Sequence, residues 1–368
     1  MKIAITVNTS WNIYNFRSGL IRAIIAQGHQ VIAIAPEDEF SQRLVDMGCT
    51  FRSIKMDNTG SNPITDLKLY LQLKKIYKRE KPDIIYQYTV KPNIYGSLAA
   101  RSLDIPVINN VSGLGTVFLN KGMAPFIAKK LYKWAFQQVA LVFFQNNDDK
   151  RDFLNQIKLP KLNTQLIPGS GINLSTFQSQ KELSNRPVRF LMIARLILDK
   201  GVMEYLEAAR ILKQSHPMVE FQLLGQLDEG HARGVKLDTL SSYIEEKSIC
   251  YLGTNDQVRD IIEDATCVVL PSYREGTPKT LLEAAAMGRP IITTDVPGCR
   301  EVVVDGENGL LCQVRSSQDL REKMHQIIKK DLFSLKVMGE KGRKLVEDKF
   351  DEKIIIEKYL SETSKIID

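Results

Sequence analysis

The stretch Glu275-Gly-Thr-Pro-Lys-Thr-Leu-Leu-Glu283 follows an apolar run, Ala265–Leu270, that has the composition of a buried strand. Thr277 is expected to cap the helix that follows, with Pro278 at its first position, where no backbone donor is needed. Such a turn directs N–H groups and the positive end of the helix toward an anion such as a phosphate. Glu275 then lies beside the anion and Glu283 inside the helix, so the two carboxylates suit the two ends of a nucleotide sugar.

A second stretch, Phe190-Leu-Met-Ile-Ala-Arg195-Leu-Ile-Leu-Asp-Lys200-Gly201, lies earlier in the same half of the chain. It reads as an apolar strand followed by Arg195 and Lys200 in a loop and then by a glycine. The forked guanidinium of Arg and the point charge of Lys are the usual phosphate-binding groups. Either stretch alone fits an ordinary strand-to-helix loop, but the two in this order favour a site for a diphosphate.

Together the two stretches resemble the R-x4-K-G and E-x7-E elements of retaining glycosyltransferases of family 4, which have the GT-B fold. Other segments read like the branch of that family that extends polyprenyl-diphosphate-linked glycans in bacteria and includes bacillosamine-dependent N-acetylgalactosaminyltransferases. These segments are Asn15-Phe-Arg-Ser-Gly-Leu-Ile, Lys91-Pro-Asn-Ile-Tyr-Gly96, Ser112-Gly-Leu-Gly115 and Gly298-Cys-Arg-Glu301. The resemblance covers nearly the whole chain.

The resemblance implies a nucleotide-sugar donor, UDP-linked, and an acceptor glycan on a polyprenyl diphosphate. Arg195 and Lys200 would neutralise the departing diphosphate, Glu275 would contact the donor sugar and Glu283 the ribose hydroxyls. Gly276 and Thr277 would then allow close backbone approach. The residues expected to be catalytic are Glu275, Arg195 and Lys200, and those expected to bind the donor are Arg195, Lys200, Glu275, Gly276, Thr277 and Glu283.

No D-x-D triplet occurs in the sequence, so a metal-bound diphosphate of the GT-A type is not expected. We therefore expect no metal and no cofactor, with the cations and the helix dipole stabilising the leaving group. No carboxylate is placed as an evident nucleophile in the first half, which favours a same-face mechanism over double displacement.

Acceptor-side residues are expected in the first half of the chain. Many family 4 enzymes place a histidine near the sugar in this half, but here the loop reads Tyr86-Gln-Tyr-Thr-Val-Lys91-Pro, which leaves that contact open. The aromatic and basic residues after the first strand could bind the acceptor sugar or its diphosphate. The acceptor-side candidates are Trp11, Tyr14, Arg17, Lys91, Gly113 and Gly115.

The chain of 368 residues is long enough for two domains with separate cores. Strands and helices alternate throughout, which is typical of parallel sheets covered on both faces. The fold class expected is α/β, with two doubly wound, Rossmann-like domains facing a cleft in the GT-B arrangement. We place the first domain at residues 1–178 and the second at 187–350, joined by the polar segment Ser179–Pro187. The last helix, 351–368, is expected to cross back to the first domain.

Charge is unevenly distributed between the two halves. Residues 1–178 hold 22 Lys and Arg against 12 Asp and Glu, whereas residues 179–368 hold 28 against 31. A basic first half indicates a polyanionic partner, and because no nucleic-acid module is recognisable, an anionic membrane surface is favoured over nucleic acid. Five scattered cysteines without a C-x-x-C spacing fit a reducing cytoplasm. Because no apolar run is long enough to span a bilayer, we expect a peripheral protein on the inner face of the plasma membrane.

Two helical segments carry lysines on one face. Lys68, Gln72, Lys75 and Arg79 lie opposite Leu69, Leu73 and Ile76, which is typical of the solvated face of an amphipathic helix. In the second segment, cations alternate with bulky apolar residues, a pattern that suits an interfacial helix on anionic lipid. The residues expected at the membrane are Lys129, Lys130, Lys133 and Trp134, beside Lys121, Phe126 and Ile127.

Three other functions compete with this interpretation. A UDP-sugar 2-epimerase shares the GT-B architecture but needs no acceptor site, and a non-catalytic carbohydrate-binding module needs no diphosphate clamp. A glycosyltransferase acting on a soluble acceptor is the third. Gly113-Leu-Gly115 follows a strand but lacks the third glycine and the acidic residue of a dinucleotide-binding motif, so that interpretation is disfavoured.

Overall fold

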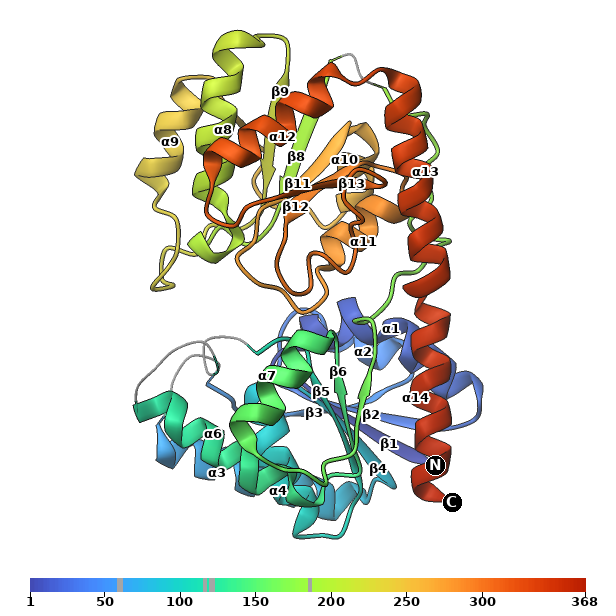
Figure 1. Cartoon of the computed structure of the whole chain (residues 1–368). Coiled ribbons are helices and arrows are strands. Elements are labelled where there is room, and N and C mark those ends of the chain that lie inside the picture. The colour runs from blue at the N-terminus through green and yellow to red at the C-terminus, as the bar shows by residue number, and fades with distance from the viewer. Residues whose placement is uncertain (58–61, 115–117, 119–122, 185–186) are drawn as a thin grey trace. The chain divides into compact units, whose positions relative to one another are not determined.

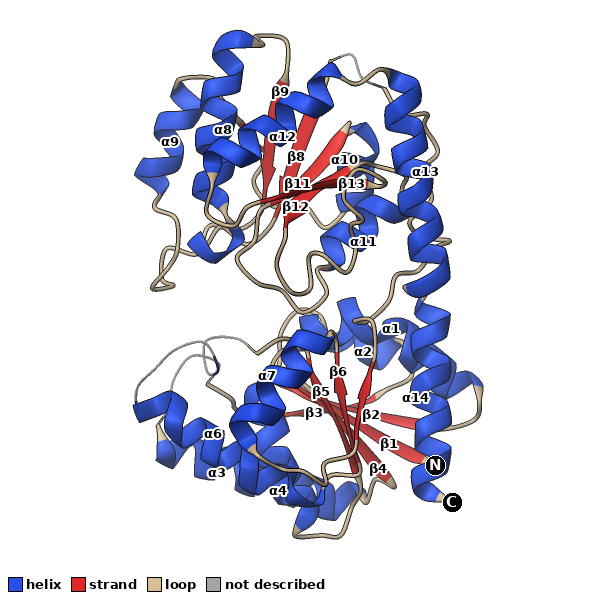
Figure 2. Cartoon of the chain, viewed as in Figure 1, coloured by secondary structure: helices blue, strands red, loops and turns tan. Residues whose placement is uncertain are grey.

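Two parallel sheets organise the protein, each with helices against it (Figures 1 and 2). The structure is a computed structural model that describes residues 1–57, 62–114, 118, 123–184 and 187–368. The chain divides into two units, one formed by Met1–Ser170 with Glu352–Asp368 and the other by Gly171–Asp351. The second unit is therefore inserted into the first.

The sheet of the first unit has the order β3-β2-β1-β4-β5-β6-β7, and all its strand pairs are parallel. Its strands are β1 (Lys2–Thr6), β2 (Gln30–Ala35), β3 (Thr50–Ser53), β4 (Ile84–Tyr88), β5 (Val107–Val111), β6 (Leu141–Phe144) and β7 (Thr164–Leu166). Its helices are α1 (Ser10–Ala26), α2 (Ser41–Asp46), α3 (Pro63–Glu80), η1 (Pro92–Gly96), α4 (Ser97–Arg101), α6 (Met123–Ala135), η2 (Phe136–Gln138), α7 (Asn147–Ile157) and α14 (Glu352–Ile367).

Alternate residues of the central strands supply two separate cores, because successive side chains of a strand point to opposite faces. Ile3 and Ile5 of β1 join a cluster with residues of α1, α2 and α14, whereas Ala4 joins a cluster with α3 and α4. A third cluster holds residues of α6 and α7 against β6. Both faces of the sheet are covered, which explains why its central strands β4 and β5 are buried along their whole length.

The last helix, α14, packs against this first sheet, whose strands come much earlier in the chain (Figure 1). The ring of Tyr359 is 2% exposed and lies 5.2 Å from the ring of Tyr86 and 4.9 Å from that of Phe143. Asn110 Nδ2 donates a hydrogen bond to the Tyr359 hydroxyl at 3.0 Å, and the hydroxyls of Tyr86 and Thr363 are hydrogen-bonded. The last helix thus completes a core begun by the first strand.

The second sheet repeats the topology of the first, with the order β10-β9-β8-β11-β12-β13 and parallel pairing throughout. Its strands are β8 (Arg189–Ile193), β9 (Glu220–Leu224), β10 (Cys250–Tyr251), β11 (Cys267–Leu270), β12 (Ile291–Thr294) and β13 (Gly309–Cys312). Its helices are η3 (Leu198–Lys200), α8 (Val202–Ser215), α9 (Leu237–Glu245), α10 (Val258–Asp264), α11 (Lys279–Ala286), α12 (Ser317–Lys329) and α13 (Leu332–Lys349). Across the described parts of both units, no helix is apolar over a length that would cross a bilayer.

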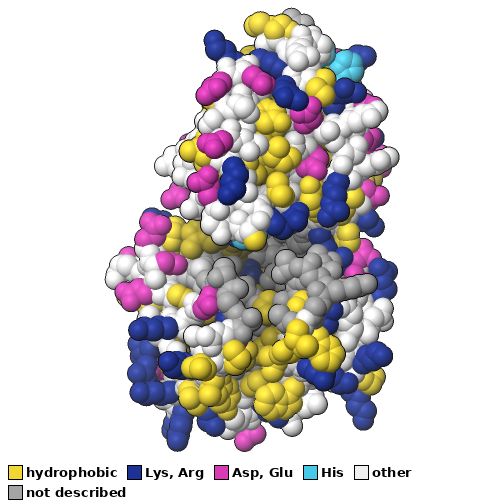
Figure 3. All heavy atoms as spheres, turned by 90° about the vertical axis from the view of Figure 1, so that its left-hand side faces the viewer, with side chains coloured by type: hydrophobic (Ala, Val, Ile, Leu, Met, Phe, Trp, Pro, Cys, Tyr) yellow, Lys and Arg dark blue, Asp and Glu magenta, His cyan; other side chains and the backbone are white. Residues whose placement is uncertain are grey.

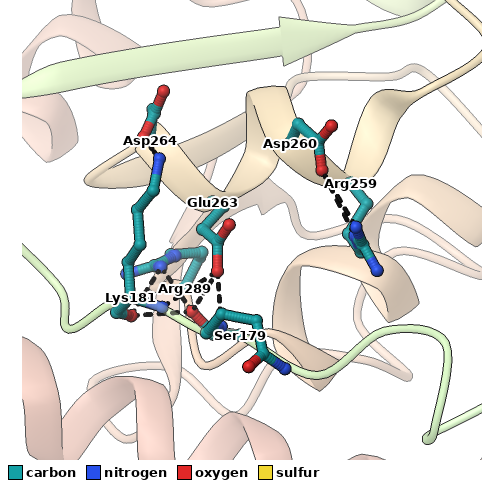
Figure 4. Close-up of polar contacts among 8 residues, drawn as sticks. Ser179, Lys181, Arg259, Asp260, Glu263, Asp264 and Arg289 are labelled. Atoms are coloured by element: carbon teal, nitrogen blue, oxygen red, sulfur yellow. Dashed lines mark hydrogen bonds and ion pairs between the residues drawn. The ribbon is translucent and has the colours of Figure 1, made fainter.

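The segment that enters the second unit packs on that unit from Gly171 onward, whereas the sequence placed the boundary at residues 179–187. Figure 4 shows its polar anchor beneath α10. Glu263 accepts a hydrogen bond from the backbone N–H of Lys181 at 2.9 Å, and Arg289 Nη2 donates to Ser179 Oγ at 2.9 Å. Arg289 is 1% exposed, so one side chain of this anchor is buried, and it holds a segment whose polarity indicated a linker.

Candidate active site

The two motifs converge where the strand order of the second sheet reverses. Arg195 and Lys200 follow β8, and Glu275 follows β11, the strand that pairs with β8. In doubly wound folds, ligands bind outside the carboxyl ends of the strands at such a reversal. The topology therefore brings both stretches to the position where this class of fold binds nucleotides.

A glycine in the left-handed backbone conformation, Gly201, allows close contact between the loop after β8 and the loop after β11. Gly201 begins α8 with a φ of 72°, and a Cβ there would lie 2.1 Å from the backbone O of Pro271. Across the same contact, the backbone N–H of Tyr273 donates to the backbone O of Asp199 at 2.8 Å. Any other side chain at residue 201 would strain the backbone and separate the loops. The glycine that ends the R-x4-K-G stretch is thus explained by packing.

Lys200 and Glu275 contact one another directly. Lys200 Nζ forms a hydrogen-bonded ion pair with Glu275 Oε1, and Ser272 Oγ donates to the same oxygen at 2.7 Å. The Lys200 and Glu275 side chains are 25% and 13% exposed. The ammonium group is thereby held beside the turn into α11. Ser272 was missed as a site residue because a serine after a strand is ordinary in turns.

Arg195 is the more exposed cation of the loop. Its side chain is 55% exposed, and Nη1 lies 3.7 Å from Asp228 Oδ2. An ion pair at this distance and exposure holds a guanidinium only weakly. Arg195 can therefore turn toward an anion at little cost. No motif in the sequence indicates Asp228 as the partner of Arg195.

Thr277 does not cap α11, so that prediction is wrong. The helix begins at Lys279, and its N-cap is Pro278, with φ −73°, ψ 114° and no side-chain cap hydrogen bond. Because proline occupies the cap position, the Thr277 hydroxyl stands one residue too early to reach the first turn. Thr277 Oγ1 is buried and has no hydrogen-bond partner. An unpaired hydroxyl beside a helix N-terminus that no side chain caps suits an oxyanion.

A second glycine supports this turn. Gly298 has a φ of 84°, and a Cβ there would lie 2.3 Å from the backbone O of Gly276. The backbone N–H of Glu275 donates to the backbone O of Pro297 at 3.2 Å. Gly298 therefore lets the segment Gly298-Cys-Arg-Glu301 pack closely against the backbone of this turn.

Glu283 lies on the second turn of α11 and is 7% exposed. Burial raises the pKa of this carboxyl above its ordinary value, and Lys279, whose Nζ lies 3.9 Å from Glu283 Oε1, opposes that rise. Acidic side chains are rarely this buried without close partners. The position suits a carboxylate that accepts hydrogen bonds from ligand hydroxyls.

In the first unit, three of the acceptor-side candidates lie on α1, the helix that follows β1 at the corresponding reversal between β1 and β4. Trp11, Tyr14 and Arg17 all lie in the first half of α1. Arg17 is 7% exposed, its guanidinium carbon lies 4.0 Å from the ring centroid of Tyr88, and its Nε has no hydrogen-bond partner. Trp11 is 45% exposed and packs edge-on against Phe16. Of these candidates on α1, Arg17 is therefore a buried cation, whereas Trp11 is an exposed aromatic side chain.

Lys91 is held by α3. Its Nζ lies 2.7 Å from Asp66 Oδ1, and the Tyr95 hydroxyl donates to Asp66 Oδ2 at 2.8 Å. Both charged side chains are largely buried, so this ion pair anchors the loop after β4. Gly113 has a φ of 130°, a conformation that glycine adopts readily, whereas Gly115 lies outside the described residues.

The membrane candidates lie on α6. Lys130 and Lys133 are exposed and Trp134 is 50% exposed. Lys130 Nζ lies 4.5 Å from the ring centroid of Phe126, and Lys129 Nζ lies 5.9 Å from that of Phe118. Two exposed lysines, Lys130 and Lys133, and two exposed aromatic rings, Phe126 and Trp134, therefore lie on this helix.

The described residues contain no group of three or more His, Cys, Asp or Glu side chains placed to hold a metal ion. Metal independence itself stays a prediction, because a substrate can supply ligands of its own.

Two doubly wound units with paired loops at a switch point define a nucleotide-binding α/β protein. Two sequence families match this chain: residues 175–345 match "Glycosyl transferases group 1", and residues 2–146 match "Glycosyl transferase 4-like". The N,N'-diacetylbacillosaminyl-diphospho-undecaprenol alpha-1,3-N-acetylgalactosaminyltransferase of Campylobacter jejuni is 30% identical, covering 100% of this chain and 99% of that protein. This protein belongs to the group 1, family 4-like glycosyltransferases.

Other relatives agree with this membership. The UDP-Gal:alpha-D-GlcNAc-diphosphoundecaprenol alpha-1,3-galactosyltransferase of Escherichia coli is 26% identical over 68% of this chain and 67% of its own. Among solved structures, Anabaena HepE in complex with UDP and glucose has a TM-score of 0.80 at 18% identity, covering 99% of both chains. Sucrose-phosphate synthase from Thermosynechococcus elongatus has a TM-score of 0.82 at 18% identity, covering 100% of this chain and 99% of its own. The GT-B fold is confirmed, and family membership favours glycosyl transfer over the epimerase.

Proposed function

We propose that this glycosyltransferase transfers an N-acetylhexosamine or a related hexose, with retention, from a UDP-sugar to a polyprenyl-diphosphate-linked glycan. Its product would enter a bacterial surface polysaccharide or a glycoprotein glycan. The observation that carries the proposal is Lys200, held beside the N-terminus of α11 at the switch point of the second sheet. The names of the relatives from C. jejuni and E. coli, which both specify diphosphate-linked lipid acceptors, support this class of acceptor.

The donor roles follow from charge and position. Arg195 and Lys200 neutralise the charge that builds on the departing diphosphate, which is where positive charge contributes most to rate. Thr277 supports this assignment, because its buried hydroxyl lacks a partner and can donate to a phosphate oxygen. Glu275, which orients Lys200, contacts the donor sugar, and Glu283 accepts hydrogen bonds from the ribose hydroxyls.

Retention follows if the acceptor attacks from the face that the diphosphate leaves. The departing phosphate oxygen then takes the proton of the attacking hydroxyl, so no enzymic nucleophile is needed. The cations at the switch point lower the energy of the developing diphosphate and leave the sugar free to react on that face.

The first unit binds the acceptor and contacts the membrane. Arg17, a buried cation whose Nε has no partner, is the strongest acceptor-side candidate. Lys91 is the weakest as a direct contact, because Asp66 already pairs with it. Lys129, Lys130 and Lys133 contact the anionic cytoplasmic face of the plasma membrane, where the lipid-linked acceptor resides.

Incubation with UDP-sugars tests the reaction class. With a panel of UDP-hexoses and UDP-N-acetylhexosamines, we expect UDP release only when a polyprenyl-diphosphate-linked saccharide is added, and an α-linked product from an α-linked donor. The matched control is the Arg195→Ala variant with the same pair of substrates. Formation of an epimer from the UDP-sugar alone would overturn the proposal, and turnover with a free saccharide but no lipid-linked one would replace the acceptor class.

Chelation tests metal independence. Because the two cations and the helix N-terminus are proposed to carry the charge of the leaving group, activity should persist within about twofold in excess EDTA. The measurement is the initial rate of UDP release before and after chelation, with a metal-dependent GT-A enzyme treated in parallel. A loss of more than about tenfold that Mg²⁺ or Mn²⁺ restores would contradict this mechanism.

A further inference from the structure

An exposed apolar row runs along α3, on the face that the sequence pattern suggested was simply solvated. Ile64, Leu67 and Leu71 are 66%, 58% and 53% exposed. Their spacing of three and four residues places them on one side of the helix. Leu69 and Leu73 are 1% and 0% exposed and lie on the other side, within the core. Large apolar side chains therefore lie on both faces of the helix, and those on the outer face are not covered by other described residues of the protein.

The orientation of α3 is fixed, so the row cannot turn inward. Asp66 holds the first turn by its contacts with Lys91 and Tyr95. Tyr77, fully buried near the other end, contacts Thr6 through its hydroxyl at 3.0 Å. Contacts at both ends thus keep the apolar row facing outward.

The same face of α3 is cationic beyond the apolar row. Lys68, Lys75 and Lys78 are exposed. Lys68 lies between Leu67 and Leu71, and the spacing of Lys75 and Lys78 from Leu71 continues the row toward the C-terminal end of the helix. The acidic residues of the helix are engaged elsewhere: Asp66 pairs with Lys91, and Glu80 pairs with Arg52 and Arg79. This face therefore combines apolar side chains with a net positive charge.

The row lies on the same side of the first unit as the exposed residues of α6. Tyr70 of α3 packs against the cluster that contains Tyr132 of α6, so the two helices share a core. In the lower part of Figure 3, hydrophobic side chains gather among Lys and Arg, on the side that carries α3 and α6 in Figure 1. Of the nineteen exposed large hydrophobic side chains among the described residues, seven lie on these two helices. Such clustering marks an interaction surface.

We propose that α3 is a second lipid-contacting helix, whose row Ile64, Leu67 and Leu71 enters the headgroup region of an anionic membrane beside α6. The inference deepens the proposed function, since it names the surface by which the enzyme meets its lipid-linked acceptor. Lysines next to apolar residues match anionic headgroups above acyl chains. A second copy of this chain fits less well, because a symmetric contact through this face would bring its lysines against each other.

Vesicle binding by paired variants tests the role of α3. The full-length double variant Leu67→Ser/Leu71→Ser should lose at least tenfold in partitioning to vesicles of phosphatidylglycerol and phosphatidylcholine, measured by sedimentation. The matched control is Met218→Ser/Phe333→Ser, which removes two side chains of the second unit that are 79% and 76% exposed. This control should bind as the parent protein does. Because all four side chains are exposed, both variants are expected to fold, which thermal melting checks.

Two further measurements separate lipid contact from its alternatives. Lys75→Glu/Lys78→Glu should weaken binding and reduce its dependence on salt, because these lysines would meet anionic headgroups. Equal vesicle binding by the α3 double variant and the parent would overturn the proposal. So would a change from dimer to monomer in the double variant, in light scattering, with vesicle binding unaltered.

Activity distinguishes failure of this inference from failure of the proposed function. With a short-chain, water-soluble diphosphate-linked acceptor, the α3 double variant should turn over UDP-sugar within about twofold of the parent, whereas with a vesicle-embedded acceptor it should be at least tenfold slower. Equal slowing with both acceptors would contradict a lipid role. The vesicle-binding result stands whether or not this acceptor class proves correct, since binding is measured without turnover.

Discussion

Replacing Arg195 or Lys200 by alanine should each lower kcat/KM by at least about a hundredfold, on the order of 3 kcal/mol of transition-state stabilisation. The physical reason is the loss of a positive charge where the departing diphosphate becomes negative. Arg195→Ala is the cleaner test, because its side chain is 55% exposed and its 3.7 Å contact with Asp228 is weak. Its melting temperature should therefore match that of the parent.

Lys200→Ala should be at least as damaging, since it also removes the partner that orients Glu275. The matched control is Arg259→Ala, which removes a half-exposed cation paired with Asp260 in the same unit. Steady-state kinetics and thermal melting on all three variants complete the experiment. A loss smaller than about threefold for Arg195→Ala, or an equal loss for the control, would remove the cationic loop from the mechanism.

The two glutamates should separate donor-sugar contact from nucleotide contact. Glu283→Ala is expected to weaken UDP binding by ten- to a hundredfold, because hydrogen bonds to a charged group contribute roughly 1.5–3 kcal/mol. Since burial raises the pKa of Glu283 and therefore disfavours its charge, removing the carboxylate should not reduce thermal stability. Glu275→Ala should abolish most turnover while changing the Kd for UDP by less than about threefold.

Isothermal titration of UDP into both variants decides between the roles. Glu307→Ala, which removes a carboxylate paired with Lys341 at 3.6 Å in the same unit, is the control and should bind UDP normally. If Glu275→Ala loses UDP binding and Glu283→Ala keeps it, the two roles are exchanged. Loss of UDP binding by the control as well would point to a general defect of the domain.

The alternation of apolar strands and helices was enough to predict two doubly wound domains, because period and composition report on local structure. It also placed both motifs after strands. It did not show that β8 and β11 are neighbours, since pairing between strands so far apart in the chain depends on the sheet order and not on local pattern. The meeting of Lys200 with Glu275 follows from that pairing.

Other features of the site depend on a single position or on distant contacts. The cap at Thr277 was predicted from residue type, yet the helix begins one residue later than that prediction requires, and Pro278 takes the cap position. Lys91 looked available for an acceptor, but Asp66, which belongs to an earlier helix, pairs with it. Side chains that meet across the fold have no periodicity that a sequence could display.

The burial of apolar side chains on α3 could be predicted only in part. The helix Pro63–Glu80 was interpreted as one apolar face opposite a charged face, which accounts for Leu69 and Leu73. Leu67 and Leu71 break this pattern, since they lie on the outer face and yet are apolar. A sequence shows which residues are apolar, whereas the structure shows which of them remain uncovered.

The return of α14 to the first unit has a consequence for how the protein is made. The first unit lacks Tyr359 and its helix until the whole second unit, Gly171–Asp351, has been synthesised. At typical translation rates of about 5–20 residues per second, this delay lasts roughly 10 to 40 s. During that interval Tyr86 and Phe143 lack the aromatic ring that covers them in the folded protein. The domain that leaves the ribosome first is therefore the one completed last. Its apolar surface stays uncovered until α14 has been made, whereas the second unit, a single continuous segment, can already fold.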